Sequence, residues 1–195
     1  MLASGPASAD GDDSAQRGIL VQEATFEDVL RRSGIDALYF EVGISDSSNS
    51  DVLRYGLDAR WRWNRPLLEF QGLRVNGYWS VRLGYWDNDS SMPTNSGLVD
   101  VGVAPVLRIE PRAAWSVSPY LEAGVGAHLL TESSVSTQRR FGGAFQFGSF
   151  AGAGVRFGPK QRFDLGYQFQ HLSNAGLSDP NNGINFHQIR LGYWF

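Results

Sequence analysis

The sequence predicts an all-β protein, an eight-stranded antiparallel transmembrane β-barrel with a polar, side-chain-filled interior. Apolar residues recur at every second position over long stretches from residue 38 to residue 195, while the positions between them carry glycine, arginine and acids. No run of 18 or more apolar residues is present, which excludes transmembrane helices. A soluble ligand-binding barrel would instead place its apolar side chains inside and its polar ones outside.

The predicted strands follow one another along the chain, each with one apolar face. The apolar series run through residues 38–44, 53–63, 75–85, 99–109, 121–129, 147–157, 163–169 and 189–195. Tyr78 and Trp86 break the alternation, because they fall on the polar face of the third strand. Eight strands enclose only enough space for their own side chains, so we expect a charge-paired plug and no pore. The expected partners are Arg60, Arg82, Arg108 and Arg156 with Glu41, Asp58, Asp100, Glu122 and Asp164.

We divide the chain into an N-terminal tail, residues 1–34, and a barrel, residues 35–195. The first 18 residues lack the apolar segment of a secretory signal, although Pro6-Ala7-Ser8-Ala9 resembles the end of a cleavage site. Residues 19–34 are compatible with a short amphipathic helix. We expect short turns at 64–66 and 158–160, and longer polar links at 87–96, 131–143 and 174–183 on the opposite, outward-facing end.

Composition excludes several classes of function. A net charge of −3, from 17 basic and 20 acidic residues, offers no general attraction for nucleic acid. The absence of cysteine excludes disulfides, thiol nucleophiles and thiolate metal sites. The terminal Phe195 follows Tyr193, Leu191 and Ile189 at alternate positions, which resembles the C-terminal assembly signal of bacterial outer-membrane proteins. We therefore expect the chain in the bacterial outer membrane.

Polar side chains interrupt the lipid-facing surface at one end of the last two strands. The outward series of the seventh strand continues to His171 and Ser173, and that of the eighth extends back to His187 and Asn185. Residues i and i+2 of a strand share a face, so His171 can reach the Ser173 hydroxyl. If the hairpin pairs Ser173 with Asn185, then His171 faces His187 and lies diagonal to Asn185. This arrangement supplies a nucleophile, a base and an orienting group, as in serine hydrolases.

A less specific interpretation must be weighed against this one. A His-x-Ser pair alone is common on protein surfaces, and polar residues are ordinary at the rim of a membrane barrel. His128 falls on the interior face, where we expect a structural role, and we expect His187 to be an interfacial side chain. The alternative function is therefore a non-catalytic structural or adhesive small barrel, which would share every feature except the motif.

The motif residues themselves resemble a known family. The stretch His171-Leu172-Ser173-Asn174-Ala175-Gly176, followed by Pro180-Asn181-Asn182-Gly183-Ile184, is similar to the signature of the lipid A 3-O-deacylases, the PagL family. The resemblance implies that Ser173 is the nucleophile, that His171 is its general base, and that Asn174 and the backbone N–H of Gly176 form the oxyanion hole.

The same resemblance implies the substrate and the setting. The substrate would be lipid A, the anchor of lipopolysaccharide, in the outer leaflet among other outer-membrane lipids. It would lose the ester-linked 3-hydroxyacyl chain at position 3, without metal or cofactor. The sequence leaves open whether the barrel forms a homodimer.

One residue departs from the family pattern. The third member of the family's catalytic triad is typically a glutamate, and this chain has Asn185 at that position. An asparagine carbonyl can still accept a hydrogen bond from the imidazole and hold its tautomer, but it supplies no negative charge. Asp179 in the neighbouring loop is an alternative third residue.

Overall fold

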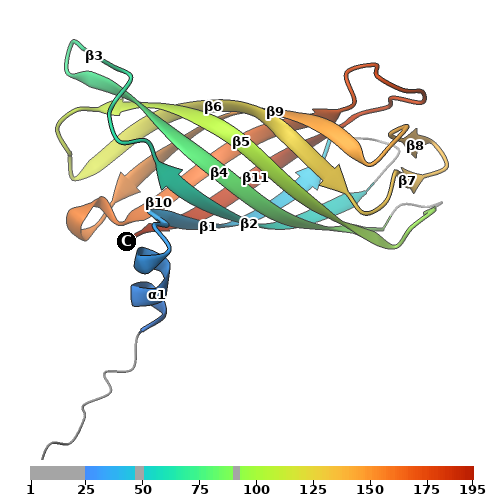
Figure 1. Ribbon diagram of the computed structural model, residues 1–195, viewed down its shortest axis with the longest axis horizontal. Helices are drawn as coiled ribbons and strands as arrows, with labels where there is room; N and C mark the ends of the chain where they lie inside the picture. Colours follow the sequence, from blue (N-terminus) through green and yellow to red (C-terminus); the bar gives the residue numbers. More distant parts are fainter. Residues whose placement is uncertain (1–24, 47–50, 90–92) are drawn as a thin grey trace, which may run out of the picture.

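A computed structural model describes residues 25–46, 51–89 and 93–195. Within these ranges, eight long antiparallel strands form a closed barrel (Figure 1). They are β1 (Ala37–Ser45), β2 (Val52–Arg62), β4 (Leu73–Asn88), β5 (Gly97–Pro111), β6 (Val117–Leu130), β9 (Phe145–Phe157), β10 (Phe163–Ser173) and β11 (Ile184–Trp194). Consecutive strands pair around the wall, and β11 pairs with β1 to close it. The predicted all-β, eight-stranded barrel is confirmed.

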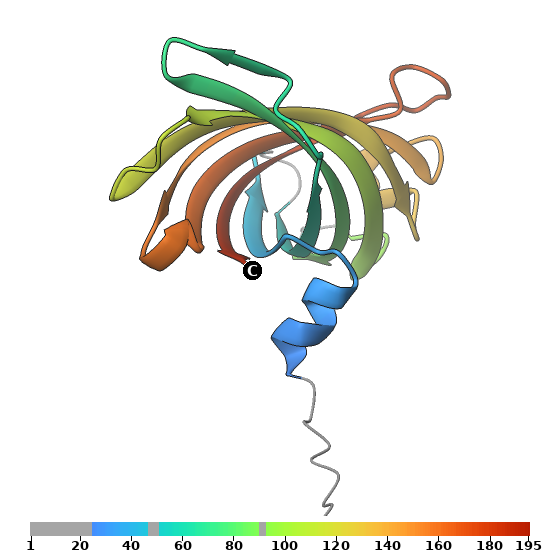
Figure 2. The ribbon, with the colours of Figure 1, turned by 60° about the vertical axis from the view of Figure 1, so that its left-hand side comes forward.

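The two ends of the barrel carry different additions (Figures 1 and 2). One end, here called the helix end, carries helix α1 (Phe26–Arg32), the 3-10 turn η1 (Pro159–Gln161) and the short strand β3 (Leu68–Phe70). The other, here called the loop end, carries the hairpin of β7 (Ser134–Ser136) and β8 (Arg139–Arg140), together with the link 174–183. Two of the three longer polar links, 131–143 and 174–183, thus lie at one end, as predicted; the third, 87–96, falls partly outside the described residues. Most of the predicted tail, residues 1–24, lies outside the described residues.

The link after β2 differs from the prediction. Residues 64–66 bend the chain without reversing it, and the reversal comes at Gln71 and Gly72, whose φ angles are 46° and 79°. Two positive φ angles in succession are the geometry of a type I′ hairpin turn. Strand β3 therefore pairs with the beginning of β4 and protrudes beyond the wall (Figure 2).

The outer face of the wall is apolar along its whole circumference. Most of the predicted lipid-facing series is exposed, for example Phe40 at 50% and Leu121 at 61%. Other members are Leu57, Trp79, Leu83, Val101, Val125, Leu165, Tyr167 and Ile189. An exposed apolar surface of this extent is costly in water and favourable in lipid. In the described part of the chain, no helix combines the length and the apolar character needed to cross a membrane.

The middle of the lumen is filled by fully buried ion pairs. Arg108 Nη2 lies 2.6 Å from Glu122 Oε2, Arg108 Nη1 lies 2.9 Å from Asp164 Oδ2, and Arg60 Nη1 lies 2.9 Å from Glu122 Oε2. Further pairs are Arg60–Asp58, Arg82–Asp58, Arg54–Glu41, Arg54–Asp100, Arg190–Glu41, Arg190–Asp58 and Arg190–Glu122. The predicted plug is present. Arg156 is an exception, because it pairs with Glu110 at 3.9 Å near the helix end and with none of the expected acids.

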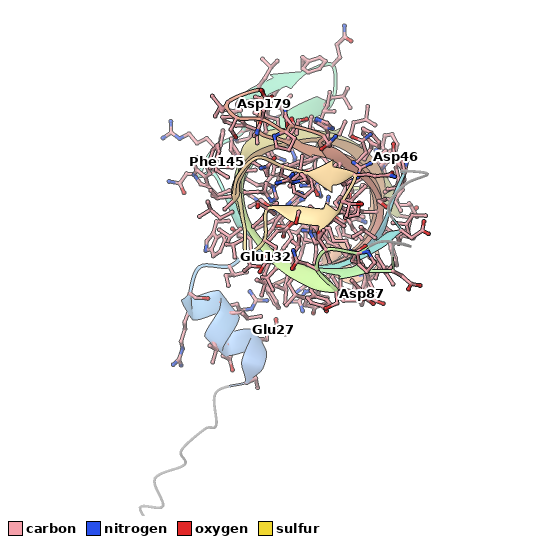
Figure 3. The ribbon with its side chains drawn as sticks, turned by 90° about the vertical axis from the view of Figure 1, so that its right-hand side faces the viewer. Glu27, Asp46, Asp87, Glu132, Phe145 and Asp179 are labelled. Atoms are coloured by element: carbon pink, nitrogen blue, oxygen red, sulfur yellow. The ribbon has the colours of Figure 1, made fainter. Side chains whose placement is uncertain are left out.

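At the loop end the lumen contains a buried apolar cluster, which the polar character of the inward-facing positions did not predict. Trp86 packs edge-on against Phe186, with ring centroids 4.8 Å apart, and against Phe141 at 6.1 Å. Trp86 Nε1 also donates to Asp100 Oδ2 at 3.0 Å, so the ring joins the apolar cluster to the charged one. The β7–β8 hairpin lies across this opening (Figure 3), and its Val135 belongs to the same buried cluster.

Candidate active site

His171, Ser173 and Asn185 lie together on the outer wall at the loop end. Each continues the outward series of its strand, and each is half-buried. The register differs from the one assumed above: His171 stands directly opposite Asn185, and Phe169 stands opposite His187. His171 Nδ1 lies 2.6 Å from Asn185 Oδ1. The direct cross-strand position replaces the expected diagonal one and brings the two side chains into hydrogen-bond contact.

The hydrogen bonds of Asn185 define the tautomer of His171. Asn185 Nδ2 donates to Asp46 Oδ2 at 3.0 Å, which orients the amide so that its oxygen faces the imidazole. That oxygen can only accept, so Nδ1 of His171 carries the proton. Nε2 is then left with its lone pair, which is the state required of a general base.

Ser173 borders the same small space as the imidazole. Within the described chain, the Ser173 hydroxyl makes no hydrogen bond to His171. Both residues lie against Gly183, where an added Cβ would stand 3.1 Å from His171 Cε1 and 3.4 Å from Ser173 Cβ. Hydrogen bonds between nucleophile and base are often long without substrate and shorten when it binds.

Asn174 and Gly176, the expected oxyanion donors, hold the 174–183 link together. The Asn174 side chain is buried, and its Nδ2 donates to Phe141 O at 2.8 Å and to Ser178 O at 2.6 Å. Its Oδ1 accepts the backbone N–H of Gly176 at 2.9 Å. Both donors are therefore engaged within the loop in this conformation.

A polar hollow of about 280 Å³ lies beside the imidazole, and it contains residues that the sequence did not single out. Its lining includes Asp46, Arg139, Asn182 and Gly183 together with His171 and Asn185. Arg139 Nη1 donates to Gly183 O, which ties β8 to the site. Burial lowers the pKa of Arg139, and the neighbouring Asp46 carboxylate opposes that shift. Both charged residues lie far from the motif in sequence, so only the fold reveals them.

Apolar side chains flank the other side of Ser173. In the register of β10 with β9, Ser173 stands opposite Phe147, whose ring packs edge-on against Phe145 with centroids 5.0 Å apart. Both rings are exposed on the outer wall. The serine thus lies between these apolar rings and Gly183, which lines the polar hollow, and this placement suits a substrate with a hydrocarbon chain and a polar head.

Comparison with known proteins identifies the family. The family model described as lipid A 3-O-deacylase (PagL) matches residues 52–194. The chain belongs to the PagL family. It is 31% identical to the lipid A deacylase PagL of Pseudomonas aeruginosa over 137 residues, which cover 70% of this chain and 75% of that one. It is 40% identical to the lipid A deacylase PagL of Bordetella bronchiseptica over 76 residues, which cover 39% and 41% of the two chains.

A solved structure supports the same assignment. The crystal structure of the outer membrane enzyme PagL superposes with a TM-score of 0.70 at 26% identity, covering 82% of this chain and 99% of that one. The resemblance inferred from the motif is confirmed. PagL membership and the apolar outer wall together place the chain in the bacterial outer membrane.

Gly183 offers a first test of the PagL-family site. In Gly183→Ala the new methyl would stand 3.1 Å from His171 Cε1 and from Leu172 O, closer than ordinary contact, at a residue whose φ of 58° disfavours any side chain. Because displacing reacting groups by about 1 Å can cost about 100-fold in rate, we expect deacylation to fall at least about that far. Initial rates on purified lipid A in detergent would measure it.

The control for this variant is Gly72→Ala. Gly72 has a φ of 79° and no atom within 4 Å of an added Cβ, so it carries similar backbone strain at the helix end without steric conflict. We expect its activity to stay within about twofold of the parent. Equal loss in the two variants would show that strain, and not crowding of the site, is responsible.

Proposed function

We propose that this PagL-family protein is an outer-membrane lipid A 3-O-deacylase that uses Ser173 as nucleophile and His171 as general base. It hydrolyses the ester that links a 3-hydroxyacyl chain to position 3 of lipid A. The observation that carries the proposal is the hydrogen bond of His171 Nδ1 to Asn185 at the outer wall, which leaves Nε2 basic beside Ser173. The family match supports the choice of substrate.

The proposed reaction has two halves. In the first, Nε2 of His171 takes the Ser173 proton as Oγ attacks the ester carbonyl carbon, and the tetrahedral intermediate expels the sugar oxygen, which receives that proton. In the second, His171 takes a proton from water, which attacks the acyl-serine carbonyl. The proton then returns to Oγ as the 3-hydroxy fatty acid leaves. Asn185 holds the imidazole in place through both halves.

The oxyanion in this proposal is held by the Asn174 amide and the Gly176 N–H, as the family resemblance implies. Their present partners are Ser178 O and Phe141 O for the amide, and Asn174 Oδ1 for the N–H. Substrate binding would therefore have to exchange at least one of these bonds for one to the developing oxyanion. A donor that strengthens its bond only in the transition state accelerates the reaction.

We further propose that the loop end faces the cell exterior, so that the site meets the outer leaflet. Lipid A diffusing in that leaflet could lay its acyl chain along the apolar wall beside Phe147, with its ester at Ser173. The lumen offers no route, because buried ion pairs and the cluster around Trp86 fill it. The position of the site on the outer wall supports this lateral approach.

Mass spectrometry of lipid A from cells that express the chain would test the proposed activity. We expect lipid A to lose the mass of one 3-hydroxyacyl unit, with the matching free fatty acid recovered. Labelling of Ser173 by a fluorophosphonate would separate this function from the alternative of a structural or adhesive barrel. Unchanged lipid A together with an unlabelled serine would favour that alternative.

Asn185→Ala tests the third residue. Without the amide, the imidazole can rotate, and we expect deacylation to slow by at least about tenfold, or roughly 1.4 kcal/mol. Initial rates on purified lipid A would measure the change. His187→Ala is the matched control, because His187 lies on the same face and instead contacts the Tyr167 hydroxyl at 2.6 Å. We expect its rate to stay close to that of the parent.

The competing assignment gives Asp179 the role of Asn185. Asp179 is exposed, and Figure 3 labels it and Asp46 on different parts of the loop end. Full activity in Asn185→Ala combined with collapse in Asp179→Ala would show that Asp179 is the third residue.

A further inference from the structure

Asp46 and Asn185 are joined by two hydrogen bonds at the loop end. The backbone N–H of Asp46 donates to Asn185 O at 3.3 Å, and Asn185 Nδ2 donates to Asp46 Oδ2 at 3.0 Å. Asp46 directly follows β1, and Asn185 lies near the start of β11, the strand paired with β1. The pairing of the first and last barrel strands therefore brings this carboxylate to the site.

The contacts form a continuous chain from the imidazole to the carboxylate. His171 Nδ1 donates to Asn185 Oδ1 at 2.6 Å, and the other end of the same amide donates to Asp46. A carboxylate that accepts from an amide N–H polarises it and makes its carbonyl oxygen a better acceptor. The bond to His171 should accordingly strengthen when the imidazole becomes positively charged during the reaction.

Among the described residues, the other titratable groups near the imidazole are Arg139 and His187. Arg139 of β8 lines the same hollow, and its charge interacts with Asp46. On β11, His187 is the next outward-facing residue after Asn185, and its Nδ1 is hydrogen-bonded to the Tyr167 hydroxyl. On β9, the residue opposite His171 is the uncharged Ser149. Asp46 is thus the carboxylate that the structure places in contact with the third residue.

We propose that Asp46 is a positioning residue that acts on His171 through Asn185, and that these two residues together replace the single glutamate typical of the family. This inference rests on the proposed function of Ser173 and His171. The amide supplies the hydrogen-bond acceptor, and the carboxylate behind it supplies the negative charge. The imidazolium of His171 is therefore still stabilised by a negative charge, which lies on Asp46, one residue beyond Asn185.

Kinetics of Asp46→Ala would test the inference in the full-length barrel, with purified lipid A in detergent. We expect kcat to fall about tenfold, because the carboxylate stabilises the charged transition state, and KM to change no more than in the charge control Asp87→Ala. The acidic limb of the kcat–pH profile should move to lower pH, since an imidazole without the nearby negative charge loses its proton more readily. A purely structural contact would not move that limb.

Asp87→Ala is the matched control for charge. Asp87 is an exposed acid at the same end, on β4, and its loss changes the net charge by the same amount. Since lipid A is anionic, removing any acid here could tighten substrate binding, and this control measures that effect. We expect its kcat and its pH profile to match the parent. Equal kcat and pH profiles in Asp46→Ala and Asp87→Ala would overturn the inference.

A second background separates positioning from folding. In Asn185→Glu the introduced carboxylate can bond His171 directly, and Asp46 becomes a like-charged neighbour. Adding Asp46→Ala to that variant should leave kcat unchanged or raise it, in contrast to the loss in the parent. An equal loss in both backgrounds would mean that Asp46 only supports the local fold and would overturn the inference.

These experiments also distinguish failure of the inference from failure of the proposed function. If the parent releases no 3-hydroxyacyl chain, or if Ser173→Ala releases it at the parental rate, the proposed function fails. If the parent is active, Ser173→Ala is inactive and Asp46→Ala behaves as Asp87→Ala, only the inference fails.

Discussion

Replacement of Ser173 by alanine should leave a folded barrel and lower deacylation by about four decades, equivalent to roughly 5.5 kcal/mol of transition-state stabilisation. The side chain is half-buried at the end of β10, and its hydroxyl makes no hydrogen bond to His171 that the fold would lose. The loss should therefore fall on kcat and leave stability unchanged. Release of 3-hydroxy fatty acid from purified lipid A would measure it, and heat-modifiable migration on a gel would report folding.

Ser149→Ala is the control for this variant. Ser149 is an exposed serine on β9, opposite His171, and has no assigned role in the reaction. We expect it to keep the parental rate. Parental activity in Ser173→Ala would remove Ser173 as the nucleophile, whatever the family match implies about the substrate.

Replacement of Glu122 by alanine should destabilise the barrel more than any change at the rim. Glu122 is buried and pairs with Arg60, Arg108 and Arg190, so its removal leaves three buried cations short of an anionic partner. Removing one member of a buried pair commonly costs about 3–5 kcal/mol. We expect the free energy of unfolding to fall by about that amount. Urea titrations of the protein refolded into lipid vesicles would measure it.

Glu69→Ala is the matched control, because it removes the same side chain from an exposed pair. On the protruding β3 hairpin, Glu69 Oε2 lies 3.5 Å from Arg112 Nε. Because both side chains are exposed, this ion pair contributes less than about 1 kcal/mol. Should Glu122→Ala fail to fold, Glu122→Gln keeps the size of the side chain and one of its two acceptor oxygens while removing the charge, with a smaller loss expected. Equal urea midpoints for the Glu122 and Glu69 variants would contradict a stabilising role for the plug.

Strand positions and facing could be predicted from the sequence because lipid and lumen impose opposite demands on alternate residues. Phe40, Leu121 and Tyr167 face outward as predicted, and Arg60, Arg108 and Glu122 face inward. The alternating pattern does not show where an aromatic residue on the inward, polar face will pack, so the apolar cluster around Trp86 was not predicted. Nor does it fix turn geometry, and the reversal at Gln71 and Gly72 was missed for that reason.

Only part of the candidate site could be predicted from the sequence. The alternation of apolar and polar positions placed His171, Ser173 and Asn185 on one face. It is equally compatible with registers of β10 and β11 that differ by two residues, and the register assumed from the sequence was wrong. The link 174–183 sets that register through its own contacts, among them the buried Asn174 amide. Asp46 and Arg139 could not be predicted, because each reaches the site from a distant strand end.

The seam between β1 and β11 constrains how the barrel can assemble. Ala37 pairs with Trp194 across it, so this contact forms only after nearly all of the intervening chain is in place. Arg190 of β11 forms ion pairs with Glu41, Asp58 and Glu122, which come from three other strands. An open sheet without β11 would therefore expose both unpaired edges and those acids, and closure should be a late, cooperative and comparatively slow step. The same step brings Asp46 to Asn185, so we expect catalytic competence to arise only as the wall closes.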